Sequence, residues 1–62
     1  MFMFKIENTD HTTVYISASD VVRLVERQYN GGGCVIIFRD GSRVETYKPI
    51  DEVHALVNGS LR

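Results

Sequence analysis

Hydrophobic and polar residues alternate along the first part of the chain. From residue 2 to residue 7 every second side chain is large and apolar, beginning with Phe2, and this two-residue period is typical of a half-buried strand. A polar turn cluster at residues 8–11 follows, and residues 12–16 alternate again. We therefore predict a first β-hairpin built from strands 2–7 and 12–16.

The second clear pattern is a hairpin around Asp40-Gly41. Residues 34–39 predict an apolar strand and residues 42–48 the returning strand, and Asp-Gly between them is typical of a type I′ turn. Both faces of the first of these strands are apolar, so it needs cover on both sides. One small domain hardly provides two covers. The pattern therefore indicates self-association or a partner.

The middle of the chain fits two interpretations. Ser17 and Asp20 resemble a capping box, and some apolar residues that follow have helical spacing. The run after Asp20 is also rich in β-branched residues, which favour strands. We predict a helical turn near 19–22 and a strand over 23–29; the alternative is a helix over 19–28. Three glycines, Gly31 to Gly33, then predict a flexible hairpin tip.

The end of the chain predicts one helix over residues 49–58. Pro49 suits a helix start, and Asp51 and Glu52 lie in the first turn, where the helix dipole favours acids. An apolar stripe follows at helical spacing. Asn58-Gly59 predicts the end of the helix.

These elements predict an α+β fold in a single domain, residues 1–62: a four- to five-stranded antiparallel β-meander with the C-terminal helix packed on one face. The helix is expected to cover Phe4, Ile6, Val14, Ile16, Ile36 and Phe38. The opposite face is apolar too and is the predicted interface. Its residues are Met3, Tyr15, Val35, Ile37 and Tyr47.

Size and composition restrict how such a fold is stabilised. A chain of 62 residues buries only about 60% of its unfolded surface. Its single cysteine excludes an internal disulfide, and no Cys and His residues have zinc spacing, so we expect neither metal nor cofactor. Oligomerisation remains as a source of stability. No apolar run is long enough for a membrane span, so we expect a soluble, cytoplasmic protein without membrane contact.

Candidate catalytic groups have simpler explanations. Gly31 to Gly33 lack the following helix and the Lys or Ser/Thr of a phosphate-binding loop. Cys34 is expected to be a buried small hydrophobe, because no base is positioned to activate it. His54 lies off the apolar stripe of the helix, and His11 lies in a turn. We therefore predict no catalytic residues and no enzymatic activity.

Two arginines support an alternative function. Arg39 and Arg43 flank the second hairpin turn, and a β-ribbon of this kind can enter the major groove of DNA. Tyr29 and Tyr47 could stack on bases. The net charge of −1 and the acids interleaved with the arginines argue against this function.

The order of motifs resembles the FlbD/SwrD-like small bacterial proteins linked to flagellar and swarming motility. The resemblance covers most of the chain and is carried by Val14-Tyr15-Ile16-Ser17, Asp20-Val21-Val22, Val35 to Gly41, Tyr47 and Asp51-Glu52-Val53. The triple glycine, the Met-Phe-Met-Phe start and Pro49 depart from that family. The second half also looks like a fragment of a LytTR-type DNA-binding domain, and small phage or prophage proteins have the same appearance. These resemblances imply a small regulator and bring no catalytic residues.

The functional prediction is a non-enzymatic binding or regulatory protein that contacts itself, as a homodimer or higher oligomer, and another protein. Arg39 and Arg43 would form the polar rim of this interface. If the protein is instead a nucleic-acid-binding regulator, the same two arginines would contact the nucleic acid. A third possibility is a small-ligand site between subunits, with the loop from Gly31 to Gly33 over the ligand.

Overall fold

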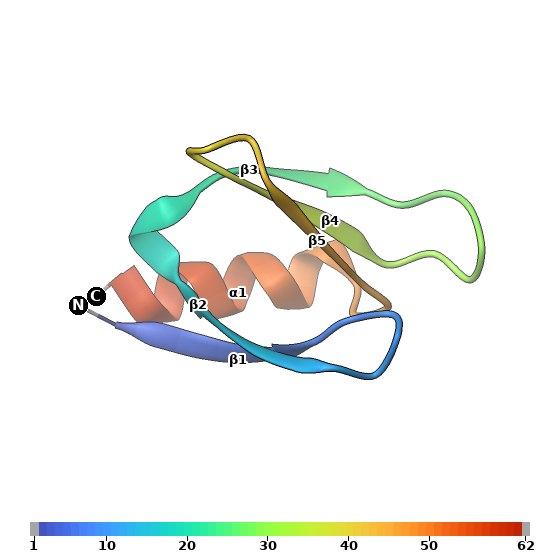
Figure 1. The fold of residues 1–62 in the computed structure, drawn as a ribbon, viewed down its shortest axis with the longest axis horizontal. Helices are drawn as coiled ribbons and strands as arrows, with labels where there is room; N and C mark the ends of the chain where they lie inside the picture. Colours follow the sequence, from blue (N-terminus) through green and yellow to red (C-terminus); the bar gives the residue numbers. More distant parts are fainter. Residues whose placement is uncertain (1, 62) are drawn as a thin grey trace.

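The protein, in a computed structural model that describes residues 2–61 and only the backbone of Leu61, has antiparallel strands and one C-terminal helix (Figure 1). This confirms the α+β class. The elements are β1 (Met3–Glu7), β2 (Thr13–Ser17), the 3-10 turn η1 (Ala18–Asp20), β3 (Val21–Glu26), β4 (Cys34–Phe38), β5 (Arg43–Thr46) and α1 (Ile50–Leu61).

The strands form two sheets, so the prediction of one continuous meander of four to five strands is wrong. β1 pairs with β2, and β4 lies between β3 and β5 in a separate three-stranded sheet. The chain passes from one sheet to the other through η1, where Arg39 N donates to Asp20 O at 3.0 Å. The predicted turn therefore comes slightly earlier than residues 19–22, and the helix considered for residues 19–28 does not form. The β-branched residues there join a sheet, which suits their stiff side chains.

The two short hairpin turns, β1–β2 and β4–β5, share one geometry. Each has a three-residue loop closed by a main-chain hydrogen bond, from Asn8 N to Thr12 O at 2.8 Å and from Phe38 N to Ser42 O at 2.9 Å. The last loop residue has a positive φ in both, 72° at His11 and 89° at Gly41. A type I′ turn needs two consecutive positive φ values, so the turn type predicted for Asp40-Gly41 is wrong.

Helix α1 begins and ends later than predicted. Pro49 precedes the helix, and its carbonyl accepts hydrogen bonds from Glu52 N at 3.0 Å and Val53 N at 3.1 Å. The helix continues through Gly59 to Leu61. A glycine inside a helix costs only about 1 kcal/mol relative to alanine, which is too little to end a helix whose preceding turn is anchored by buried Val57.

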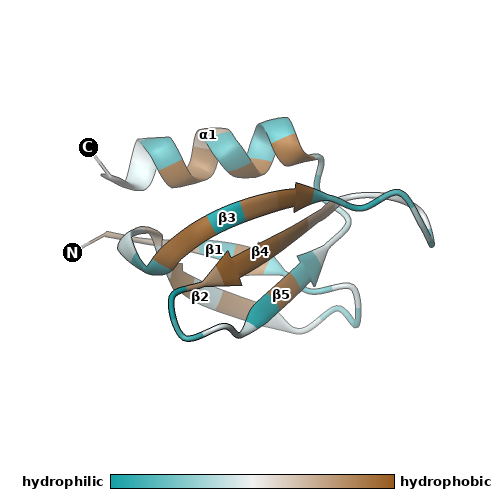
Figure 2. Ribbon diagram, turned by 90° about the horizontal axis from the view of Figure 1, so that it is seen from above, coloured by the Kyte–Doolittle hydropathy of each residue, from teal (hydrophilic) through white to brown (hydrophobic). Residues whose placement is uncertain are grey.

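The core lies between the two sheets and the helix. The four predicted core residues Phe4, Ile6, Ile16 and Ile36 are buried, whereas Val14 and Phe38 are only partly buried. The helix packs against β1, η1 and β3 rather than over one face of a single sheet (Figure 2). The other buried members of this core cluster are Ala18, Cys34, Val53 and Val57.

The two sheets therefore border two seams. We call the first the closed seam: it lies between β1 and β3, and α1 contacts both strands. We call the second the open seam: it lies between β2 and β5, the other outer strands of the two sheets. Thr9 N donates to Glu45 O at 3.0 Å at one end of the open seam. From that end β2 and β5 diverge (Figure 1).

Candidate functional site

The structure divides the predicted interface between two surfaces. Met3 and Tyr15 lie on the outer face of the β1–β2 sheet and are 55% and 67% exposed. Val35 and Ile37 lie on the outer face of the three-stranded sheet, with Tyr47 directly after β5. The five residues therefore do not form the single face that alternation along the strands predicts.

Val35 differs from the other predicted interface residues, because it is only 8% exposed within a single chain. Its register partners are Val25 on β3 and Glu45 on β5, which lie on the same face and flank it. Ile37, next along that face, is partly buried. The expectation that this strand lacks cover on its outer face is therefore wrong at Val35. The exposed part of the predicted interface consists chiefly of Met3, Tyr15 and Tyr47.

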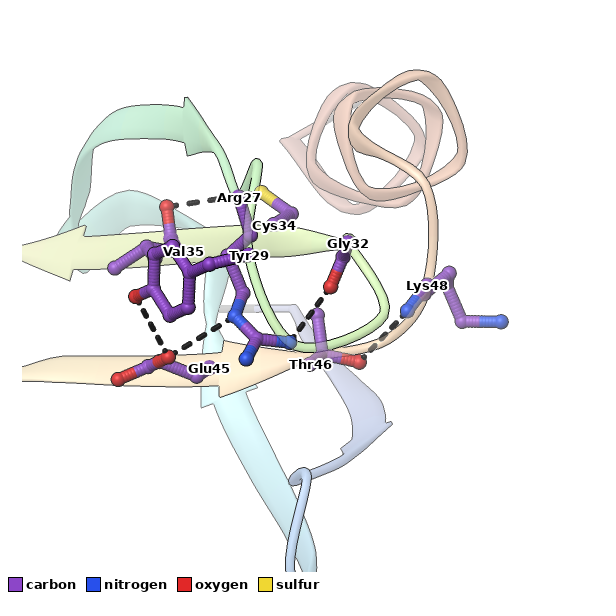
Figure 3. A network of polar contacts seen from close by, with 8 residues as sticks. All are labelled: Arg27, Tyr29, Gly32, Cys34, Val35, Glu45, Thr46 and Lys48. Carbon is purple, nitrogen blue, oxygen red and sulfur yellow. Dashed lines mark hydrogen bonds and ion pairs between the residues drawn. The ribbon is translucent and has the colours of Figure 1, made fainter.

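A buried arginine helps to cover this end of the sheet (Figure 3). The side chain of Arg27 is 4% exposed, and its guanidinium carbon lies 4.7 Å from the ring centre of Tyr29 and 5.3 Å from that of Tyr47. Its Nε lies 3.0 Å from Glu45 Oε1, but the angle is wrong for a hydrogen bond, so this contact is electrostatic. The Tyr29 hydroxyl donates to the same carboxylate oxygen at 3.0 Å.

The glycine loop is anchored by this arginine. Arg27 Nη1 donates to Gly32 O at 2.6 Å, and Arg27 N donates to Gly33 O at 2.9 Å. A side chain at Gly33 would collide with the backbone of Thr46 and Tyr47, and its φ of 108° favours glycine as well. The glycines therefore let the loop approach β5 closely and close over a buried charge, which explains them without a bound ligand.

Cys34 lies in the core beneath this sheet. It is fully buried, and its Sγ lies 3.6 Å from Val35 O. Burial raises the pKa of the thiol, which disfavours the reactive thiolate. His54 is exposed, and its Nε2 lies 3.1 Å from Asn58 Nδ2 on the next helical turn.

A groove lies at the open seam. It has a volume of about 460 Å³, and it brings Met3 and Tyr15 together with Arg39. Its apolar part includes side chains that belong to the edge of the core. Its polar part comes from η1 and the β4–β5 turn. The complete lining is Met3, Val14, Tyr15, Ile16, Ser17, Asp20, Phe38, Arg39, Asp40, Ser42 and Val44.

The two arginines of the predicted rim are separated. Arg39 borders the groove, and its Nε donates to Ser19 O at 3.0 Å. Arg43 pairs with Ile37 on the outer face of the three-stranded sheet and is absent from the groove lining. The hairpin therefore presents its two arginines to two different surfaces.

Main-chain groups of β2 face the open seam. Residues of an antiparallel pair alternate between positions that exchange hydrogen bonds and positions that do not. Asn8 N donates to Thr12 O, and Ala18 N to Phe2 O at 3.4 Å, so the even-numbered residues of β2 bond to β1. The N–H and C=O groups that point away from β1 belong to Thr13, Tyr15 and Ser17.

The same reasoning applies to β5. Phe38 N donates to Ser42 O, so even-numbered residues of β5 bond to β4. The main-chain groups of Arg43 and Glu45 therefore face away from β4, and Glu45 O accepts the hydrogen bond from Thr9 N. Outward-facing main-chain groups on both sides make the open seam a place where another extended chain could bind.

Sequence reasoning missed two parts of this arrangement. One is the burial of Arg27, since arginine is among the residue types that are mostly exposed. The other is the exposure of Val22 and Val25, which the sequence pattern did not assign to any surface. The aromatic residues at positions 29 and 47 were a usable signal, because an arginine near two tyrosines can stack between them.

Comparisons of the chain with known protein families, with curated proteins and with solved structures found no match. The resemblance to FlbD/SwrD-like proteins therefore stays a prediction. Within residues 2–61, no helix combines the length and the apolar character that crossing a bilayer requires. Among the described side chains, no group of three or more His, Cys, Asp and Glu residues could hold a metal ion.

Proposed function

We propose that this protein is a non-enzymatic binding protein that associates with itself and with another polypeptide. The observation that supports the proposal is the number of large hydrophobic side chains left exposed around a core that is already filled. Such surface residues, when contiguous, mark interaction sites. They are Phe2, Met3, Tyr15, Val22, Val25, Tyr29 and Tyr47.

The residues that would carry the contact are the exposed members of the predicted interface. Tyr and Met are enriched in interfaces because they offer a large contact area. Tyr15 and Met3 line the outer margin of the groove, and Tyr47 lies at the end of the three-stranded sheet. We also propose a cytoplasmic location and a bacterial or phage origin, supported by a lone cysteine that suits a reducing compartment and by the family resemblance.

The test is the mass of the protein in solution, measured by light scattering over a wide concentration range. We expect a mass above that of one chain, which falls to one chain in a Met3→Ser/Tyr15→Ser or a Tyr47→Ser variant. Thr13→Ser, at an exposed position on the same sheet as Tyr15, is the control and should leave the mass unchanged. A wild-type protein that stays monomeric at every concentration contradicts self-association.

A nucleic-acid-binding function has one observation in its favour. Arg23 and Arg43 both pair with Ile37, so the two cations flank one residue of the outer sheet face. Binding to nucleic acid through them would weaken steeply with salt. Retention on heparin that is lost in Arg23→Gln/Arg43→Gln would support this alternative, and equal elution of both proteins would argue against it.

A further inference from the structure

The four outer strands of the two sheets differ in how they are protected against pairing with another chain. Natural edge strands avoid such pairing through charged residues, bulges, shortness or cover. β1 carries Lys5 and Glu7 and packs against α1, and β3 carries Arg23, Glu26 and a register shift after Val21. β5 has only four residues, two of them charged.

β2 has none of these protections. Its sequence, Thr-Val-Tyr-Ile-Ser, contains no charge and no proline, and its register with β1 is regular throughout. The outward N–H groups of Thr13, Tyr15 and Ser17 and the outward carbonyls of Thr13 and Tyr15 have no hydrogen-bond partner among residues 2–61, whereas the carbonyl of Ser17, the N-cap of η1, accepts the first bond of that turn. Edge groups of this kind are the template for β-strand addition.

The groove beside β2 matches an added strand. Its floor contains Val14, Ile16, Phe38 and Val44, of which all but Ile16 remain partly exposed. The volume of about 460 Å³ lies in the range of sites that bury a small ligand or a few peptide side chains. An extended chain paired with β2 would place every second side chain on this apolar floor.

The walls of the groove determine which kind of partner fits. The wall opposite β2 is formed by Arg39, Asp40 and Ser42 of the β4–β5 turn. A folded second copy that paired through its own β2 would have to bring its own β4–β5 turn against this one. A single extended segment avoids that collision, so the observations favour a linear peptide over a second copy.

We propose that the edge of β2 binds an extended segment of a partner polypeptide as an added β-strand. The segment has apolar side chains at alternating positions and a Lys or Arg at the end that lies near Asp20 and Asp40, the two carboxylates that line the groove. This inference rests on the proposed binding function and specifies the partner's chemistry and the strand that receives it.

The test begins with a phage-displayed library of short linear peptides selected on the full-length protein. We expect enriched peptides with alternating apolar residues and a terminal basic residue. The best of them, made synthetically, should protect the amides of Thr13, Tyr15 and Ser17 from hydrogen exchange. In the unbound protein these three amides should exchange faster than those of Val14 and Ile16.

A Ser17→Pro variant removes one outward N–H without touching the ladder to β1. The φ of Ser17 is −77°, which proline adopts readily. We expect the enriched peptide to bind this variant about tenfold more weakly, as the loss of one main-chain hydrogen bond implies. Ser17→Ala is the matched control, because it removes the hydroxyl and keeps the N–H.

Three results would overturn the inference: no enrichment, protection confined to residues outside β2 and the groove, or equal binding by the Ser17→Pro and Ser17→Ala variants. If the proline variant fails to fold, N-methylation of alternate peptide nitrogens tests the same strand pairing on the wild-type protein, because it removes the peptide N–H groups that would donate to the outward carbonyls of β2. Equal binding of both N-methylated forms would then overturn it. Self-association measured by light scattering is a separate result, so it can persist when peptide binding fails.

Discussion

The closed seam and the open seam join the same two sheets in different ways. At the closed seam, α1 contacts β1 and β3 and contributes Val53 and Val57 to the core. At the open seam, Thr9 N–Glu45 O joins β5 to the β1–β2 turn, and apolar residues between β2 and β5 remain partly exposed. The difference indicates that a small chain can concentrate its core packing at one seam and leave an edge strand unpaired at the other.

The largest effect is expected from a charge placed in the closed seam. Val53 is fully buried, so Val53→Asp forces an unpaired carboxylate into the core and should lower the free energy of unfolding by at least about 3 kcal/mol. Urea denaturation measures this change. His54→Asp puts the same group at the next, exposed position and should change stability by less than about 0.5 kcal/mol. Similar losses in both variants would mean that the closed seam does not anchor the fold.

A moderate effect on stability is expected from removing the hydrogen bond that connects the β1–β2 turn to β5 at one end of the open seam. Thr9 is the second residue of its turn, a position where proline is favoured. Thr9→Pro nevertheless removes the N–H that binds Glu45 O, so it should lower the free energy of unfolding by about 1 kcal/mol. Thr9→Ala keeps this N–H and is the control for the lost side chain. If the proline variant is as stable as the alanine variant, the bond contributes nothing to closing that end.

A smaller effect of opposite sign is expected at His11, in the turn that carries Thr9. His11 has a φ of 72°, a left-handed conformation that costs a side chain free energy and costs glycine almost none. His11→Gly should raise the free energy of unfolding by about 0.5 kcal/mol, since the extra freedom of glycine in the unfolded chain offsets part of the gain. The matched change, Gly41→Ala in the other turn, should destabilise the protein. Thermal denaturation of both variants compares the turns, and a stabilising Gly41→Ala would contradict their shared geometry.

The smallest effect is a pH dependence from the same two turns. Hydrogen bonds from Thr12 and Ser42 lower the pKa of Asp10 and of Asp40 below the ordinary value of 3.8. Their contribution to stability is therefore present above pH 3.8 and is lost as the pH falls below it through the lowered pKa values. Urea midpoints in acid should fall less steeply in an Asp10→Ala/Asp40→Ala variant than in the wild type. Equal slopes would show that other carboxyls dominate.

Local patterns in the sequence predict much of this fold. Alternation located the first hairpin, the Asp40-Gly41 pair located the second, and the acids after Pro49 located the start of α1 within a residue. The burial of four core residues was also predicted, because alternation along each strand separates an inward face from an outward one. These residues are Phe4, Ile6, Ile16 and Ile36. All of these depend on neighbours close in the chain, which a sequence displays directly.

Long-range relations were not predictable in this way. The division into two sheets depends on how η1 turns the chain and on hydrogen bonds such as Arg39 N–Asp20 O. The burial of Val35 depends on flanking residues from two other strands. Arg27 is an exposed residue on any average scale, and only the nearby tyrosines and Glu45 make its burial possible. The open groove could not be located for the same reason.

The burial of Cys34 gives the molecule an internal reporter. The chain has one cysteine, it has no solvent exposure, and its pKa is raised, so a thiol-specific probe reacts only when the core opens. The labelling rate therefore measures the frequency of that opening, without an introduced fluorophore or tag. A bound partner that slows this rate reveals its affinity through the thiol alone, even when its own identity is unknown.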